Sequence, residues 1–305
     1  MSGGEARPAG DGTILVTGGT GTTGRRVAAR LAARGHRVRV ASRRPGGDAP
    51  HGAAVRFDWA DTATHAPALD GVSGVYLVPA VADPDPAAHV LPFLDRARRA
   101  GVERVVLLGA SAVTEADGGL GEAYRALRER FPAWAVLRPS WFMQNFTGRH
   151  PHAESIRASG EIVSATGDGR IAFVDADDIA EVGVRALTDG RAHNAAHLVT
   201  GPQALSYADA AALLSGATGR PVRHRAVSRT VLRDRLTATG MPVEYAEMLA
   251  GMDEAIAAGA EDRTSPAVER VTGRAPRSFA EFVAAHAGDR RPGADGAADR
   301  DATDG

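Results

Sequence analysis

The sequence predicts an α/β fold: a doubly wound parallel sheet followed by a smaller, mixed C-terminal region. In the first half of the chain, short runs that are apolar throughout alternate with helical patterns. Strands of this kind are typical of a parallel sheet that helices cover on both faces. After residue 150 the apolar runs become shorter and the alternation loosens. We therefore expect one domain over residues 13–150 and a second over 151–287, partly interleaved with the first.

The first domain is expected to contain six strands. Apolar runs place them at 13–17, 38–42, 55–58, 75–78, 105–108 and 135–139. Helical spacing of apolar residues predicts a helix from Val27 to the glycine at 35, one over 87–100, and one that carries Tyr124. The stretch 66–69 is a weak helix at best.

The second domain is expected to mix short strands with helices. Strands are predicted at 161–164, 171–174, 196–199 and 222–227, and helices at 179–187, 207–218, 231–239, 243–258 and 279–287. The two ends, 1–12 and 288–305, are rich in Gly, Ala and charged residues and poor in large apolar side chains, so we expect them to be disordered.

Composition narrows the function classes. The 36 Lys and Arg residues against 37 Asp and Glu leave a net charge of -1, which gives no overall field for nucleic acid or an anionic membrane. The absence of cysteine excludes disulfides, thiolate metal sites and cysteine nucleophiles. No stretch is apolar for long enough to span a bilayer. We expect a soluble cytoplasmic protein, monomeric or homodimeric, that acts on a small molecule.

A glycine-rich loop lies between the first expected strand and the first expected helix. It reads TGGTGTTG over residues 17–24. Glycines at 18, 21 and 24 allow a tight turn, close approach to a diphosphate, and close packing of helix on strand. The diphosphate would lie on free N–H groups at the helix N-terminus. The loop therefore predicts dinucleotide binding; the alternative is a glycine turn that binds nothing.

Residues after the second and third strands indicate which dinucleotide binds. Ser42 is followed by Arg43 and Arg44, where an NAD site usually offers a carboxylate to the ribose hydroxyls. Two guanidinium groups suit a 2'-phosphate, so we expect NADP(H), unless these are solvated surface arginines. Asp58 and Trp59 end the third strand, where an acid and a ring meet the adenine or simply occupy a loop.

Candidate catalytic residues follow the fifth strand. Ser111 comes directly after it, and Tyr124 and Arg128 lie one helical turn apart on the next helix. In a hydride-transfer enzyme the tyrosine would protonate a reduced carbonyl oxygen, the serine would bind that oxygen, and the cation would lower the tyrosine pKa. The alternative is that Tyr124 packs, because it shares helical spacing with Leu120 and Leu127.

Large apolar side chains follow the sixth strand. Trp141 and Phe142 stand beside Asn145 at the carboxyl end of that strand, where a planar substrate or the nicotinamide ring would pack. The alternative is a helix start that packs on the second domain. No metal site is expected. Asp177 or Asp178 is interpreted as a helix cap, and the histidines at 150, 152, 193 and 197 as surface or loop residues.

Three motifs resemble the NmrA-like atypical short-chain dehydrogenases. They read VTGGTGTTG over 16–24, VLRPSWFMQNF over 136–146 and FVDADDIA over 173–180. The likeness covers roughly 13–287 and is greatest to the branch similar to the ergot-alkaloid iminium reductases, of agroclavine dehydrogenase and festuclavine synthase type. It implies a Rossmann domain with a small substrate domain and NADP(H) between them.

The resemblance assigns roles to individual residues. Those that match the family's diphosphate loop are Gly18, Thr20, Gly21, Thr22, Thr23 and Gly24. Arg43 matches the 2'-phosphate position, while Pro79 and the segment from Pro139 to Phe142 match the nicotinamide side. The sequence departs from the family pattern at the catalytic residues. Ketone-reducing relatives have Tyr-x-x-x-Lys, and Arg128 occupies the lysine position.

The arginine at the lysine position favours a reaction that needs no proton donor. Iminium reduction needs only hydride delivery, because the substrate already carries the positive charge. We therefore expect an NADPH-dependent reductase of an iminium, enone or quinone group in a small apolar metabolite of secondary metabolism. Two alternatives stay open: a non-catalytic NADP(H) sensor that regulates a partner protein, and a redox-neutral isomerase or cyclase that retains the cofactor.

Overall fold

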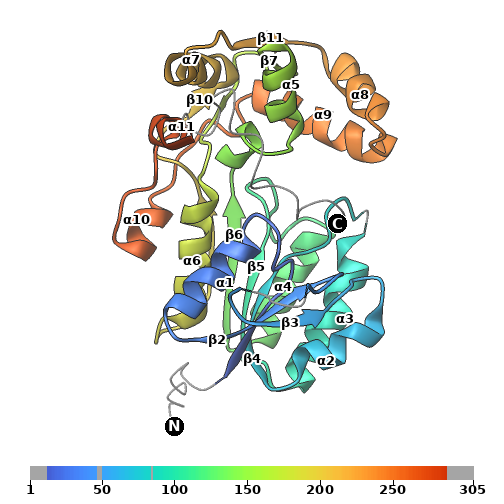
Figure 1. The fold of residues 1–305 in the computed structure, drawn as a ribbon. Coiled ribbons are helices and arrows are strands. Elements are labelled where there is room, and N and C mark those ends of the chain that lie inside the picture. Colours follow the sequence, from blue (N-terminus) through green and yellow to red (C-terminus); the bar gives the residue numbers. More distant parts are fainter. Residues whose placement is uncertain (1–11, 47–49, 84, 287–305) are drawn as a thin grey trace.

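The computed structural model describes residues 12–46, 50–83 and 85–286. The predicted disordered ends lie outside these residues, apart from Gly12. A sheet with helices on both faces forms one part of the molecule, and a helix-rich second part lies beyond the end of the sheet at which β6 finishes (Figure 1). No helix in the described ranges is both long and apolar enough to cross a membrane.

The sheet has seven parallel strands, in the order β3-β2-β1-β4-β5-β6-β9. Their bounds are β1 Thr13–Val16, β2 Arg37–Ser42, β3 Ala53–Arg56, β4 Val72–Leu77, β5 Arg104–Leu108, β6 Ala133–Pro139 and β9 Ala195–Val199. All strands are parallel, so their carboxyl ends meet at one edge, and the order reverses between β1 and β4. Ligands of such sheets bind at this edge near the reversal.

Helices cover both faces of the sheet, as predicted for a doubly wound fold. On one face lie α1 Gly24–Ala33 and α6 Ala176–Thr188; on the other lie α2 His65–Leu69, α3 Pro86–Arg99 and α4 Leu120–Arg130. Neighbouring strand residues point to opposite faces. Leu15 packs in the core beneath α3 and α4, and Val16 in the core beneath α1. This two-sided burial explains why the central strands β1, β5 and β6 are largely apolar.

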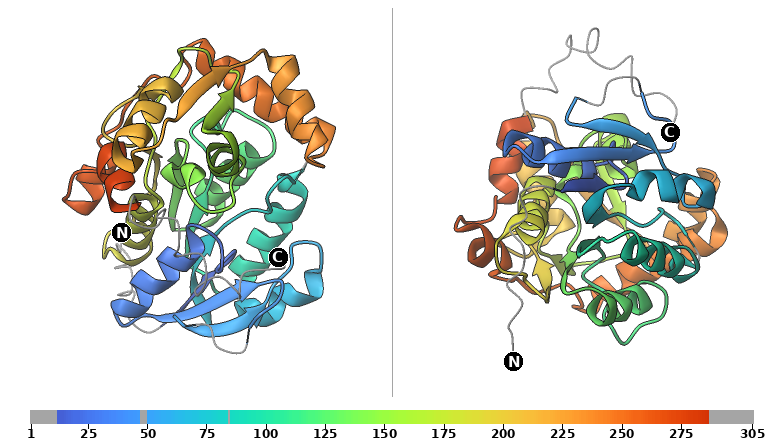
Figure 2. Two further views of the ribbon diagram at one scale, coloured as in Figure 1. Left: turned by 45° about the horizontal axis from the view of Figure 1, so that its top comes forward. Right: turned by 90° about the horizontal axis from the view of Figure 1, so that it is seen from below.

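The second part holds two small sheets among helices (Figure 2). Its elements are η2 Met143–Phe146, α5 Pro151–Ser159, β7 Glu161–Ser164, β8 Arg170–Ile171, β10 Leu205–Ser206, α7 Tyr207–Thr218, β11 Arg223–Ala226, α8 Arg229–Ala238, α9 Val243–Ala257 and α11 Phe279–His286. β7 pairs with β11 in parallel and β8 with β10 in antiparallel. The rings of Phe146, Phe173, Tyr207 and Phe279 pack together in its core.

The chain interleaves the two parts. After η2 it enters the second part, returns through α6 and β9 to the sheet, and then leaves again. The strand expected at 171–174 is shorter than predicted: only Arg170–Ile171 pairs as a strand, and Val174 makes an isolated bridge to Phe142. The sequence pattern also missed α5 and the helix α10, Ala267–Thr272. Both are short and take their stability from packing rather than from a long apolar stripe.

Candidate functional site

The glycine loop joins β1 to α1 at the carboxyl edge of the sheet. Gly18 has a φ of 58°, in the left-handed region that favours glycine. A Cβ atom on Gly24 would lie only 2.1 Å from the carbonyl oxygen of Gly18, so helix α1 begins directly against the loop. Thr17 fixes the loop from below, because its Oγ1 accepts a hydrogen bond of 2.7 Å from the amide of Val78 after β4. The backbone thus favours glycine at position 18 and leaves no room for a side chain at position 24.

The loop has the chemistry of an anion site. Gly18, Thr20 and Gly21 are exposed. Within the described residues, no backbone carbonyl accepts a hydrogen bond from the amides of Thr20, Thr22 or Thr23. The first turn of α1 contains no acidic side chain. Open amides at a helix N-terminus attract negative charge, so the residues present fit a dinucleotide diphosphate.

The two arginines after β2 are exposed at the same edge. β2 is the neighbour of β1, so Arg43 and Arg44 follow a strand adjacent to the one that leads into the glycine loop. The side chain of Arg43 makes no hydrogen bond or ion pair within the described ranges. An unengaged guanidinium here is available to a 2'-phosphate.

Asp58 and Trp59 lie beyond β3 and are engaged by the protein. The Trp59 indole Nε1 donates to the carbonyl oxygen of Val78 at 3.2 Å, and its ring meets those of Phe57 and Phe93 edge-on. The Asp58 carboxylate accepts from the amide of Ala60 at 3.0 Å. Trp59 is therefore positioned by an aromatic cluster beneath the end of β4, close to the strand that contacts the glycine loop.

Ser111 is hydrogen-bonded to a residue that sequence reasoning missed. Its hydroxyl donates to Glu261 Oε1 at 2.9 Å, and both residues are buried. Two guanidinium groups, from Arg138 and Arg263, donate to the Ser111 carbonyl oxygen at 2.6 and 3.2 Å. Glu261 lies between α9 and α10, far along the chain, so no local motif could identify it. The cluster joins the carboxyl ends of β5 and β6 to this loop.

Tyr124 and Ser111 have different partners. Tyr124 is half-buried on α4, and its ring packs against that of Trp134 with 5.7 Å between centroids. Burial, followed by the nearby Glu115 carboxylate, raises the Tyr124 pKa. Arg128 forms an ion pair of 2.9 Å with Glu115. Ser111, Tyr124 and Arg128, which were expected to act together, thus each contact a different group.

The segment after β6 forms the link between the two parts. Phe142 packs against the sheet core, while Trp141 packs against the core of the second part. The backbone N–H of Asn145 donates to the carbonyl oxygen of Phe142, the residue before η2, at 3.1 Å. Pro79 follows β4 and is half-buried, whereas Pro139 ends β6 and is buried. These residues surround the same carboxyl edge as the glycine loop.

Two buried polar atoms at this edge are left without partners. The hydroxyl of Ser140 and the Nε of Arg138 have no hydrogen-bond partner in the described part of the chain. An unsatisfied buried polar group costs free energy, and a bound ligand is one way to satisfy it. Ser140 lies next to Pro139, on the side expected for the nicotinamide.

The aspartates near the start of α6 are structural, but their roles differ from those predicted. Asp175 is the N-cap, since its carboxylate accepts from the amide of Asp177 at 2.9 Å. The prediction of Asp177 or Asp178 as the cap was therefore wrong. Asp177 forms ion pairs with Arg26 and Arg30 of α1, and no group of three or more potential metal ligands occurs in the described residues. The helix begins at 176 because Asp175 satisfies its first amides.

The histidines at 150 and 152 were expected at the surface or in loops, and the structure corrects this for His152. Its Nε2 lies 3.1 Å from the Tyr207 hydroxyl, and its ring stacks on Phe146. Burial lowers the pKa of His152 to about 3 and that of His150 to about 4. Both rings are neutral at physiological pH and support the core of the second part.

Two family models match the chain. One is described as NAD(P)H-binding and matches residues 18–190; the other is described as NmrA-like and matches residues 121–283. The oxidoreductase YesF of Bacillus subtilis, described as uncharacterized, is 50% identical over 276 residues, covering 90% of this chain and 95% of that protein. An agroclavine dehydrogenase of Claviceps fusiformis is 38% identical over 281 residues, covering 89% and 96%.

A solved structure shares the fold. The NADPH-dependent quinone oxidoreductase of Escherichia coli, in complex with NADPH, superposes with a TM-score of 0.75 at 23% identity, covering 89% of this chain and 99% of that one. The architecture therefore extends over both parts of the molecule.

Proposed function

Because the chain belongs to the NAD(P)H-binding and NmrA-like families, we propose that it is an NADPH-dependent reductase of an iminium, enone or quinone group in a small apolar metabolite of secondary metabolism. That the chain is an NAD(P)H-dependent oxidoreductase is shown at the family level. The preference for NADPH, the substrate class and the roles of individual residues are the proposal.

One observation carries the proposal: an anion-binding loop and an apolar segment share one edge of the sheet. The exposed glycine loop with its open amides would hold the diphosphate, and Arg43 would hold the 2'-phosphate. Trp141 and Phe142 follow the sixth strand at the same edge and would pack against a planar apolar group. The chain would thus bring a cofactor and an apolar substrate together by positioning.

The polar groups favour a substrate that needs no proton at the reacting carbon or heteroatom. When bound, NADPH supplies the hydride. The hydroxyl hydrogen of Ser111 is directed at Glu261, so the serine is not poised to donate to a substrate oxygen. The cation expected beside Tyr124 is paired with Glu115. An iminium group needs neither donor, whereas a ketone needs a proton on its oxygen.

The test is turnover of the purified full-length protein with NADPH against three acceptors: a cyclic iminium ion, an enone and a quinone. We expect acceptor-dependent loss of NADPH absorbance with at least one, and fastest with the iminium ion. NADPH binding without oxidation of any acceptor would instead support a cofactor sensor. Product formed without net NADPH loss would identify a redox-neutral isomerase or cyclase.

A further inference from the structure

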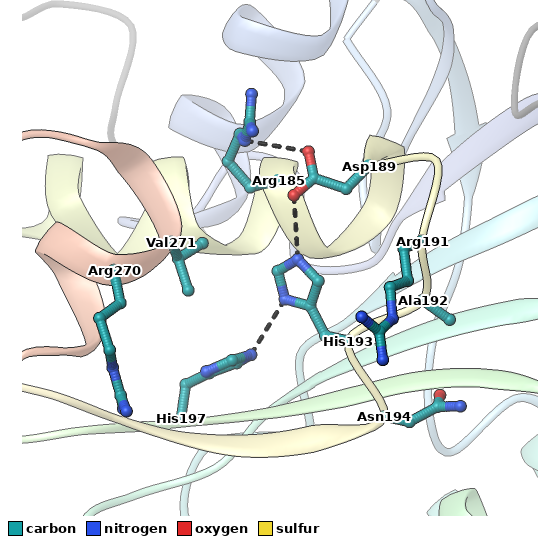
Figure 3. Close-up of a pocket in the computed structure, with 9 residues that line it drawn as sticks. All are labelled: Arg185, Asp189, Arg191, Ala192, His193, Asn194, His197, Arg270 and Val271. Atoms are coloured by element: carbon teal, nitrogen blue, oxygen red, sulfur yellow. Dashed lines mark hydrogen bonds and ion pairs between the residues drawn. The ribbon is translucent and has the colours of Figure 1, made fainter.

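A pocket of about 670 Å³ has arginine and histidine side chains in its lining (Figure 3). It is formed where α6 ends, where β9 begins and where α10 packs beside them. Its charged and histidine lining residues are Arg185, Asp189, Arg191, His193, His197 and Arg270. α6 ends at Thr188 and β9 starts at Ala195, so the pocket lies at the amino ends of the strands. It is therefore separate from the cofactor site proposed above.

The pocket has excess positive charge. Three guanidinium groups face a single carboxylate, that of Asp189. Arg185 pairs with this carboxylate at 2.9 Å, which balances both charges. The guanidinium groups of Arg191 and Arg270 have no such partner. Neither group donates a hydrogen bond to a protein acceptor in the described part of the chain. Two unpaired arginines beside one pocket are suited to a ligand that carries negative charge.

Two histidines in contact line the pocket, and their N–H groups are used within the protein. His193 Nε2 lies 3.1 Å from Asp189 Oδ2, so this nitrogen carries a hydrogen. In neutral His193 the other nitrogen, Nδ1, is then an acceptor. It lies 3.0 Å from His197 Nε2, which must therefore be the donor. The free Nδ1 of His197 is left without a hydrogen and becomes a donor only when His197 is protonated.

The surroundings of His197 oppose its protonation. Burial, then His193 and then Arg270, lower its pKa to about 4. Asp189 contacts His193 rather than His197, and its carboxylate is also paired with Arg185. A bound anion would offset the positive charge of Arg270 and so favour protonation of His197.

We propose that this pocket binds a tetrahedral dianion, a phosphate or sulfate group, which is attracted by the unpaired guanidinium groups of Arg191 and Arg270. In Figure 3 the two arginines stand on either side of the histidine pair, with Arg270 on α10 and Arg191 on the loop before β9. His197 donates to the anion from its Nδ1 when protonated. Binding is accordingly coupled to the uptake of a proton and tightens as the pH falls.

The experiment is calorimetric titration of the full-length protein with sulfate, whose charge stays constant across the pH range used. Saturating NADP⁺ is present throughout, so that the proposed 2'-phosphate site is filled. We expect one binding site, with affinity at least several-fold higher at about pH 5.5 than at about pH 7.5. Inorganic phosphate and a phosphate monoester, titrated at about pH 7.5, then distinguish a free ion from an esterified group.

Substitutions distinguish sulfate binding in this pocket from nonspecific binding to surface charge. Arg270→Gln and Arg191→Gln should each weaken sulfate binding about tenfold, since each removes a charged contact from an exposed side chain. Arg235→Gln, on the exposed surface of α8, is the matched control and should leave binding unchanged. His197→Gln should abolish the pH dependence. No sulfate binding, or equal weakening by the Arg235 control, would overturn the proposal.

Discussion

Ser111 and Glu261 are joined by a hydrogen bond of 2.9 Å although 150 positions separate them in the chain. The serine follows β5 in the sheet, and the glutamate lies in the loop between α9 and α10. Glu261 is only 3% exposed, and its carboxylate also lies 3.6 Å from the guanidinium group of Arg263. A buried carboxylate that loses a donor is costly, which makes this contact a stabilising link between the two parts.

The first prediction concerns that link. Ser111→Ala should lower the free energy of unfolding by about 1 to 3 kcal/mol, because it leaves the Glu261 carboxylate short of a donor. Glu261→Gln keeps an acceptor and should cost less. A double-mutant cycle that combines Ser111→Ala with Glu261→Ala, measured by urea denaturation, should give a coupling of about 1 kcal/mol or more. Additive effects of the two substitutions would show that the hydrogen bond contributes nothing to stability.

The second prediction concerns cofactor choice. Arg43→Ala should weaken NADPH binding by about 10- to 100-fold and NADH binding by less than about threefold, since only NADPH carries the 2'-phosphate. Fluorescence titration of both cofactors measures this, with Arg235→Ala as the control for loss of surface charge. An equal loss for both cofactors would contradict the assignment of Arg43.

The third prediction separates positioning from proton donation. Tyr124→Phe should change iminium reduction by less than about twofold, because no proton is needed at the substrate and the ring still packs on Trp134. Steady-state kinetics with unchanged NADPH affinity tests this. A fall in turnover of about 10²-fold or more would restore Tyr124 as a general acid.

The fourth prediction concerns a buried acid in the second part. Asp253 is 9% exposed, its Oδ2 accepts from the Ala165 amide at 2.8 Å, and burial raises its pKa from 3.8 to about 6. The folded chain therefore holds this proton more tightly than the unfolded chain does. The stability that Asp253 contributes is complete below about pH 4 and is lost as the pH rises through about 6.

Asp253→Asn removes this dependence while keeping an acceptor for Ala165. The stability of the unsubstituted chain relative to the variant should fall by about 2 to 3 kcal/mol between pH values of about 4 and about 7. Chemical denaturation of both proteins at these pH values measures the difference. A difference that does not change with pH would contradict the role of Asp253.

Features set by neighbouring residues were predictable from sequence. The glycine loop was recognisable because its glycines lie between an apolar strand and a helix, and Gly24 packs against Gly18 as that motif requires. The apolar strands indicated the parallel sheet because they are buried on both faces. The family resemblance was confirmed by the matching family models and relatives.

Features set by distant residues were not predictable. Nothing near Ser111 indicates Glu261, because the fold alone brings them together. The strand at 196–199 was expected, but its pairing with β6 depends on the return of the chain through α6. The N-cap at Asp175 was missed because three aspartates within four positions offer similar signals. The roles of Tyr124, Arg43 and the other site residues stay predictions until they are tested.

The central claim is hydride transfer from NADPH to a small molecule at the carboxyl edge of the sheet. The most direct measurement uses NADPH carrying deuterium at C4 of the nicotinamide, in each of the two configurations, with cyclic iminium and enone acceptors, whose products keep the transferred deuterium on carbon. With the quinone, whose O–D product exchanges with water, transfer is followed as loss of the label from the cofactor. Mass spectrometry should find one deuterium in the product of at least one acceptor, from one configuration only. Tight NADPH binding with no deuterium transferred to any acceptor would contradict the account.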